Sequence, residues 1–572
     1  MRATAATAIL LAFANARSTS NAPLEARPSS PSCPASLLAQ RERWILTASS
    51  GQKTEGANPG RHAHRVPANF ATIATTILLT LLASPSFATD LKASLIDRPS
   101  VGDLYIYGAP GKTIVTTPDI PGRSAIHVDI NTPAVKSHPW DIGAGATTTA
   151  DIHAGEHVVA AVWMRATTGT GDVTLRLQSS DAPYDGIAQT DIAPGPAWQL
   201  YRVEGTATQD YPAGHTGLTL SLNTIQQSLD IGPIYILKTD APGDLTQQLS
   251  AIPLSRTRDA GIAMPDGTTN AATLTVPPGR GPFPAVLMVA GSGRWGRNPN
   301  DPVARALLDS GLAVVQFDKR GVGQSTGTYA DFQTAQLSRD AGVIAAWLRQ
   351  QPDIDPRRTG ILGHSEGGMI AISAAAADPA IAFVVDLAGP AQDNGERTIL
   401  VQIQALRDAG APEDTVTMAE KMWRAGLDAT RQATSDDDAA ARTQSALAPF
   451  LGPKFTQADL DAIIQRVRDP ALRAVMLYDP KAELQRIRAP VLGLYGTMDH
   501  QVPGAENAAA LKDGLSNDAD VTVILMPGMN HQFQHAKLGT EAEWTTLAEP
   551  ARSDPEFLKT ITDWVRAHTK KP

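Results

Sequence analysis

Cysteine is almost absent from the chain, whose 572 residues contain only Cys33. A framework of disulfides is thereby excluded, because each bridge needs two cysteines. We expect Cys33 to lie in a region that is removed, which leaves the mature protein without a thiol nucleophile. Spacing of cysteines or histidines typical of a metal site is missing as well, so the sequence predicts no metal ion.

An excess of positive charge is also lacking. Lysine and arginine number 49 against 58 aspartates and glutamates, which gives a net charge of −9. That balance disfavours nucleic acid or an anionic membrane as a partner. Hydrophobic residues make up 42% and charged residues 19% of the chain, as in a globular protein. Its length predicts two or more domains.

The first ninety residues resemble a targeting region. Residues 1–65 are rich in Ala, Ser, Arg and Pro and show no sustained period, and an uncharged run follows from 66 to 84. The run leads to Ser86-Phe87-Ala88, a small-x-small pattern before Thr89. A basic segment, an apolar run and such a site are typical of a secretory signal peptide. We expect residues 1–88 to be removed or disordered and the protein to be exported, either periplasmic or secreted.

Two alternatives concern the same region. The apolar run is about long enough to anchor the chain in a membrane, but Pro67 and Asn69 within it favour removal, so we expect no stable membrane insertion. A signal peptide should also begin the chain, and residues 1–16 resemble a short one. Translation that starts near Val66 would explain why the second run lies so far inside.

From residue 89 to 238 the pattern alternates with period two, for example in Ala125–Ile130 and Leu218–Leu222. Clusters of Gly, Pro and Asp separate these short runs. Such strands with regular turn signals predict a β-sandwich. Residues 239–255 are interpreted as a linker.

Residues 197–203 and 229–237 resemble the late strands of jelly-roll carbohydrate-binding modules. This resemblance implies a polysaccharide as a further partner. Trp140, Trp163 and Trp198 would then form a sugar-stacking platform. The alternative is that they fill the core of the sandwich, as large aromatic side chains usually do, and we predict the core.

The remainder, residues 256–572, alternates strands with helices, which predicts a mostly parallel, doubly wound α/β sheet. The apolar stretch 284–290 is typical of a buried central strand and ends at Gly291-Ser292-Gly293. Backbone N–H groups at such a turn can point at a developing oxyanion. We therefore predict an oxyanion hole that includes the N–H of Ser292.

Gly363-His364-Ser365-Glu366-Gly367 lies between a short strand and a small apolar helix. Strand, sharp turn and helix are the context of a nucleophile elbow, which lifts the serine hydroxyl above the sheet. The glycines are needed because a Cβ there would hit neighbouring elements. The alternative is an ordinary helix start with Ser365 as its N-cap.

The partners of Ser365 follow in the chain order that α/β-hydrolases require. Asp499 comes after the strand 490–496, and His531 comes after the strand 521–526. His531 would take the proton of Ser365 and pass it to the leaving group, while Asp499 would orient the imidazole. The second oxyanion donor would be the N–H of Glu366. No organic cofactor is needed. Weaker candidates for the acid and the base are Asp386, His500 and His535.

Between elbow and acid, residues from about 392 to 485 lack strand signals. Apolar residues fall at helical spacing, as at Leu460, Ile463 and Val467. We predict a helical cap over the site, with an ordinary surface extension as the alternative.

From about Ala272 onward the chain resembles bacterial α/β-hydrolase esterases of the EstD type, related to serine aminopeptidase-like hydrolases. The resemblance is carried by Gly291-Ser292-Gly293, Asp318-Lys319-Arg320-Gly321, Gly363–Gly368, Thr497-Met498-Asp499 and Asn530-His531. It implies hydrolysis of a small-molecule carboxylic ester through an acyl-enzyme. Ala290 departs from the family, since many relatives have a histidine there, but the oxyanion hole is backbone.

Two rival functions stay open. An aminopeptidase of the same fold should have an acidic pocket for a free amine, which Glu366 or a carboxylate of the cap could supply. A sugar-binding protein with an inactive hydrolase domain is the other rival, and the complete set of Ser365, Asp499 and His531 argues against it.

Overall fold

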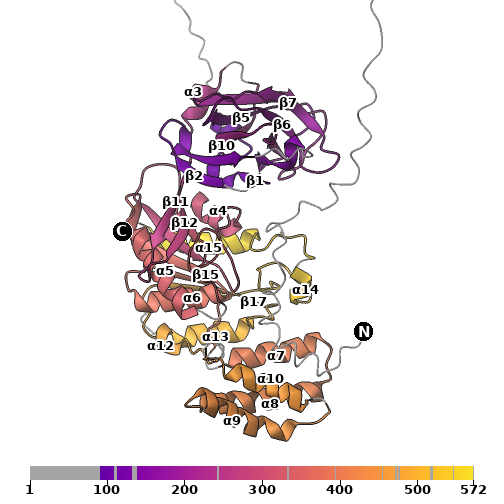
Figure 1. Ribbon diagram of the computed structural model, residues 1–572, viewed down its shortest axis with the longest axis vertical. Coiled ribbons are helices and arrows are strands. Elements are labelled where there is room, and N and C mark those ends of the chain that lie inside the picture. The colour runs from indigo at the N-terminus through magenta and orange to yellow at the C-terminus, as the bar shows by residue number, and fades with distance from the viewer. Residues whose placement is uncertain are drawn as a thin grey trace, which may run out of the picture. The chain divides into compact units, whose positions relative to one another are not determined.

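The structure is a computed structural model that describes residues 91–570 (Figure 1), apart from 109–111, 132–137, 241–243, 331–333, 393–394, 454, 471–472, 474–476, 516–519 and 545. The predicted targeting region, its cleavage site and Cys33 lie outside the described residues. Among the helices that are described, none is long and apolar enough to cross a membrane.

The N-terminal part is all β, as predicted, and consists of two five-stranded sheets in which every strand pair is antiparallel. The first sheet has the order β1 (Tyr105–Tyr107), β4 (Gly143–Thr147), β9 (Thr216–Ser221), β6 (Val173–Ser179) and β7 (Gly186–Ile192). The second has the order β2 (Lys112–Thr116), β3 (Ser124–Ile130), β10 (Gln227–Lys238), β5 (His157–Ala166) and β8 (Gln199–Thr206). Alternate side chains of both sheets form one core between them.

The opposite face of the second sheet is also covered by apolar residues. Helix α2 (Leu91–Ser94) and helix α3 (Thr246–Ser250) contribute to a separate core with Trp163, which is 8% exposed. The segment interpreted as a linker therefore packs on the sandwich through leucines such as Leu245 and Leu249.

The three tryptophans do not form a single stacking platform. Trp163 is buried in the α2–α3 core, and Trp198 packs partly against the same core. Trp140 instead lies near the first sheet, where the guanidinium of Arg176 is 5.9 Å from the centre of its ring. Burial of Trp163 agrees with the expected packing role, although its core is not the one between the sheets.

The C-terminal part is built on an eight-stranded sheet. In order its strands are β11 (Arg256–Ala263), β12 (Thr269–Val276), β14 (Ala313–Phe317), β13 (Phe283–Val289), β15 (Ile354–His364), β16 (Val384–Leu387), β17 (Val491–Gly496) and β18 (Val521–Met526). From β14 to β18 all pairs are parallel, while β12 runs antiparallel to both its neighbours. This is the α/β-hydrolase architecture that the sequence predicted.

Helices cover both faces of this sheet, because successive side chains of a strand point to opposite sides. On β13, for example, Ala285 faces one core and Val286 the other. One face is covered by α5 (Thr334–Arg349), α6 (Glu366–Ala377) and α13 (Gly504–Gly514). The other is covered by α4 (Pro302–Asp309) and α15 (Pro555–His568).

The segment between β16 and β17 is helical, as predicted. It contains α7 (Glu396–Asp408), α8 (Glu413–Arg431), α9 (Asp436–Leu447), α10 (Gln457–Val467) and α12 (Lys481–Leu484). The first four lie together in Figure 1 and share a core of their own around Ile403, Trp423 and Leu460. The Oδ2 of Asp408 at the end of α7 lies 2.9 Å from Nδ1 of His500, which follows β17.

Candidate active site

Ser365 occupies a sharp turn between β15 and α6. Its φ of 57° and ψ of −123° lie in a region that residues with a Cβ rarely adopt, so the backbone is strained there. A Cβ on Gly363 would lie 1.9 Å from the carbonyl oxygen of Gly367, and one on Gly367 would lie 2.2 Å from that of Val289. Both glycines are therefore required by close packing. The side chain of Ser365 makes no capping hydrogen bond to α6, so the turn is not explained by an N-cap role.

Asp499 and His531 lie together at the ends of two neighbouring strands. Nδ1 of His531 is 2.7 Å from Oδ2 of Asp499, and the two side chains are 2% and 0% exposed. The other carboxylate oxygen of Asp499 accepts the N–H groups of Gln501 and Val502 at 2.9 and 2.8 Å. A carboxylate fixed in this way holds the proton on Nδ1, so the free Nε2 of His531 can act as a base.

His364 connects the elbow to the loop of His531. Its Nε2 lies 2.9 Å from the carbonyl oxygen of His531, and the two rings are 4.9 Å apart. A carbonyl only accepts, so Nε2 of His364 donates. Burial, above all, lowers the pKa of His364 well below its usual range, which keeps this ring neutral. Because His364 precedes Ser365 directly, this bond holds the loop of His531 close to Ser365.

The backbone after β13 borders Ser365. A Cβ on Gly291 would lie 3.2 Å from Cβ of Ser365, so this turn abuts the elbow. The indole N–H of Trp295 donates to the carbonyl oxygen of Ser292 at 2.5 Å. The N–H of Ser292 belongs to this turn, and that of Glu366 to the first turn of α6. Of the two predicted oxyanion donors, Ser292 thus follows the residue that abuts Ser365, and Glu366 follows Ser365 itself.

The weaker candidates have other partners. Oδ2 of Asp386 on β16 lies 2.7 Å from the phenol oxygen of Tyr495. His500 pairs with Asp408, and Nε2 of His535 lies 3.4 Å from a carboxylate oxygen of Asp554.

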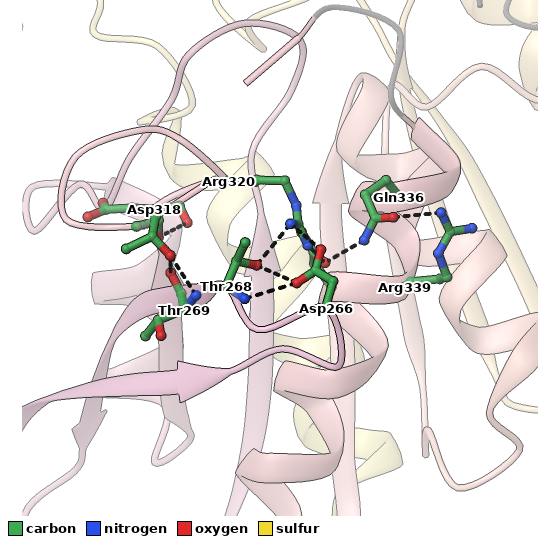
Figure 2. A network of polar contacts seen from close by, with 10 residues as sticks. Asp266, Thr268, Thr269, Asp318, Arg320, Gln336 and Arg339 are labelled. Carbon is green, nitrogen blue, oxygen red and sulfur yellow. Dashed lines mark hydrogen bonds and ion pairs between the residues drawn. The ribbon is translucent and has the colours of Figure 1, made fainter. Parts of the chain in front are cut away.

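The loop after β14 is held by a network of charges (Figure 2). Arg320, which is 6% exposed, donates to both carboxylate oxygens of Asp340 at 3.1 and 2.7 Å and to Asp266 at 2.5 Å. Hydrogen bonds from Thr268, together with Arg320, lower the pKa of Asp266 to about 2. This network ties the loop to α5 and to the hairpin between β11 and β12.

Sequence reasoning identified Ser365, Asp499 and His531 but missed two neighbours. The contact between His364 and His531 joins residues far apart in the chain, and the position before the serine in a Gly-x-Ser-x-Gly pattern carries no signal of its own. Trp544 was missed for the same reason, although its ring stacks on that of His531 at 5.7 Å.

Comparison with known proteins supports a hydrolase. Residues 266–535 match the family model of X-Pro dipeptidyl-peptidase (S15 family). The chain is 28% identical over 273 residues to Esterase EstD of Thermotoga maritima, which covers 45% of this chain and 56% of that protein. It is 32% identical over 84 residues to Thiohydrolase apmlB of Arthrinium phaeospermum, which covers 14% and 27%. The chain thus spans little more than half the length of the first of these relatives.

Among solved structures, acetyl xylan esterase 1 from Thermoanaerobacterium sp. JW/SL YS485 is similar over 56% of this chain and 90% of its own, at 17% identity and a TM-score of 0.34. The fold assignment rests on the strand order described above. The strand order gives the C-terminal part the α/β-hydrolase fold. The family model that matches it is one of peptidases, and the first relative is an esterase.

Proposed function

We propose that the protein is a serine hydrolase that cleaves carboxylic esters of small molecules. The observation that carries this proposal is the buried pair of His531 and Asp499, tied through His364 to the strained turn of Ser365. A strained serine in a glycine-bounded turn, with an imidazole oriented by a buried carboxylate close to it, is the arrangement that acyl transfer needs.

In the proposed reaction, His531 removes the proton of the Ser365 hydroxyl as its oxygen attacks the ester carbonyl. The N–H groups of Ser292 and Glu366 stabilise the tetrahedral oxyanion. The imidazolium gives its proton to the departing alcohol, which leaves an acyl-enzyme. A water molecule, deprotonated by His531, then releases the acid and restores Ser365.

An aminopeptidase is the second candidate, favoured by the match to the X-Pro dipeptidyl-peptidase family model. Recognition of a free amine requires an available carboxylate. Glu366 was one of the two kinds of candidate, beside a carboxylate of the cap, but Nζ of Lys319 lies 3.3 Å from its Oε2 and the hydroxyl of Thr334 donates to its Oε1 at 3.0 Å. A carboxylate already paired with a buried cation attracts a second cation weakly, which favours the ester.

The test compares turnover of short p-nitrophenyl esters with that of aminoacyl p-nitroanilides. We expect ester turnover in the wild type, and its loss by on the order of 10⁶ in kcat in Ser365→Ala, with an unchanged circular dichroism spectrum. A fluorophosphonate probe should label Ser365. More than about a tenth of wild-type activity in Ser365→Ala would refute this nucleophile, since a triad serine contributes far more, and faster anilide turnover would favour the peptidase.

Two further parts of the proposal concern the N-terminal regions. Export predicts that the native protein begins at or near Thr89 when its N-terminus is sequenced, and retention of residues 30–60 would contradict it.

Polysaccharide binding by the sandwich is supported by Tyr107, which is 41% exposed on the outer face of the first sheet. We expect retention of the full chain on a polysaccharide gel and its loss in Tyr107→Ala, with unchanged turnover of a soluble ester. If the full chain migrates equally fast through gels with and without the polysaccharide, this partner is refuted.

A further inference from the structure

Lys319 is a buried cation next to the candidate active site that the proposed reaction does not use. It follows β14 in the stretch Asp318-Lys319-Arg320-Gly321, and it is 1% exposed. Its Nζ donates to the carbonyl oxygen of Gly291 at 2.5 Å, in addition to its ion pair with Glu366. A charged group is buried only at a considerable free-energy cost unless it is paired, so these contacts need an explanation.

The carbonyl of Gly291 belongs to the same peptide unit as the N–H of Ser292. A trans peptide is planar, and its C=O and N–H point in opposite directions. An ammonium group that holds the carbonyl therefore also fixes the direction of the N–H. That N–H is the first of the two proposed oxyanion donors, in a turn that abuts Ser365.

The same contact should strengthen the N–H as a donor. Hydrogen bonds to a charged group are about twice as strong as neutral ones, and a peptide polarised at its oxygen donates more strongly at its nitrogen. Burial increases the effect, because the effective dielectric constant falls away from water.

The rest of this turn is held by the residues beside Lys319. The backbone N–H of Lys319 donates to the carbonyl oxygen of Trp295 at 3.3 Å. Oδ1 of Asp318 accepts the backbone N–H of Arg297 at 2.8 Å. The segment 291–297 is thus attached to the end of β14 at three points, and the side chain of Lys319 holds the point nearest the nucleophile.

We propose that Lys319 is a positioning residue that orients and polarises the Gly291–Ser292 peptide so that the Ser292 N–H stabilises the oxyanion. This rests on the proposed function, because it requires Ser365 as the nucleophile. The lysine forms and breaks no covalent bond in the reaction.

The first measurement is the second-order rate at which a fluorophosphonate labels Ser365. Phosphonylation places an oxygen in the oxyanion hole and needs no knowledge of the natural substrate. The second is the ratio of kcat/KM for an oxygen ester to that for its thionoester, in which sulfur replaces the carbonyl oxygen. Sulfur accepts hydrogen bonds poorly, so the ratio reports the hole itself. Unlike either rate alone, the ratio does not change when part of the protein is unfolded.

Three variants separate the possible roles. Lys319→Met removes charge and donor, Lys319→Gln keeps a neutral donor, and Glu366→Gln removes only the carboxylate charge beside the lysine. Lys238→Met is the matched control, because it breaks a partly buried lysine–glutamate pair in the sandwich, where Nζ is 2.8 Å from Glu156. Circular dichroism and thermal melts report folding of each.

We expect Lys319→Met to lower the labelling rate by about tenfold to a hundredfold, somewhat less than removal of an oxyanion donor. The oxygen-to-thiono ratio should fall by about tenfold and KM should change little, since the donor acts mainly in the transition state. Lys319→Gln should lie between Lys319→Met and the wild type, and this order is measurable even if Lys319→Met folds poorly. Lys238→Met should match the wild type.

An unchanged ratio in Lys319→Met and Lys319→Gln would overturn the proposal, including the case in which both esters slow equally. A Glu366→Gln variant that reproduces the full loss would also overturn it, because the lysine would then act through that carboxylate. Absence of label on wild-type Ser365 would refute the nucleophile and this proposal together. A wild type that is labelled at Ser365 but cleaves no ester would refute the esterase alone, and the labelling rates would still test Lys319.

Discussion

Asp386 should make the stability of the hydrolase domain depend on pH. The side chain is fully buried on β16, and burial, chiefly, raises its pKa to about 7 from an ordinary 3.8. The phenol of Tyr495 supports this, because it has one proton but lies 2.7 Å from Oδ2 of Asp386 and 3.1 Å from the carbonyl oxygen of Gly389. A protonated Asp386 can donate to the phenol oxygen while the phenol donates to Gly389.

The direction of this pH dependence follows from the difference between the pKa of Asp386 in the folded protein and in the unfolded chain. The unfolded chain loses the proton near pH 4, whereas the folded protein keeps it until about pH 7. The contribution of Asp386 to stability is therefore fully present below pH 4 and is lost as the pH rises to 7. Each pKa unit corresponds to 1.36 kcal/mol, so the loss is about 4 kcal/mol between these limits.

Asp386→Asn should remove this dependence, since an amide stays neutral and can still donate to Tyr495. The assay is urea unfolding of both proteins from pH 4 to 8, followed at the transition of the hydrolase domain. We expect the free energy of unfolding of Asp386→Asn, relative to the wild type, to rise by about 4 kcal/mol across this range. A difference that stays constant with pH would refute the assignment of a neutral carboxyl.

Two other substitutions test packing around the site, each with a control. Gly367→Ala should abolish ester turnover and destabilise the protein, because the new Cβ would lie 2.2 Å from the carbonyl oxygen of Val289. Its control is Gly342→Ala in α5, where a new Cβ would meet nothing within 4 Å. This control should stabilise the protein by roughly 0.5–1 kcal/mol. Arg320→Met should lower the free energy of unfolding by about 3–5 kcal/mol, because it leaves the buried carboxylate of Asp340 without its arginine partner. Its control is Lys559→Met, which breaks an exposed ion pair and should change the free energy of unfolding by less than about 1 kcal/mol. Denaturant unfolding measures all four, and equal effects within either pair would contradict the packing argument.

Features that depend on adjacent residues could be predicted from the sequence. The elbow is one, because strand, Gly-x-Ser-x-Gly and helix follow one another directly, and the structure has β15, Ser365 and α6 in that order. Asp499 and His531 were predicted from their order in the chain after Ser365 and their positions directly after two strands, and the structure joins them at 2.7 Å. Their catalytic roles stay a prediction until activity is measured.

Features that depend on contacts between distant segments could not be predicted. The burial of Lys319 against Gly291 is one example, because a lysine in a glycine-rich loop is usually solvated. The packing of residues 239–255 is another. Their polar start, Asp240–Asp244, is typical of a linker, while Leu245 and Leu249 lie four residues apart and bury on one face of α3. Here the signal was present, but it was shorter than the pattern that usually marks a helix.

The neutral state of Asp386 also has a consequence for catalysis. Its carboxyl lies beneath the first turn of α6, where a Cβ on Gly368 would come within 2.1 Å of Oδ1. The N-terminus of a helix favours negative charge, so an ionised Asp386 would compete with the oxyanion for the same field. Ester turnover should therefore fall as the pH rises through about 7 in the wild type and stay level in Asp386→Asn. Measurement of kcat against pH for both proteins tests this, and an identical alkaline limb would show that Asp386 does not influence the reaction.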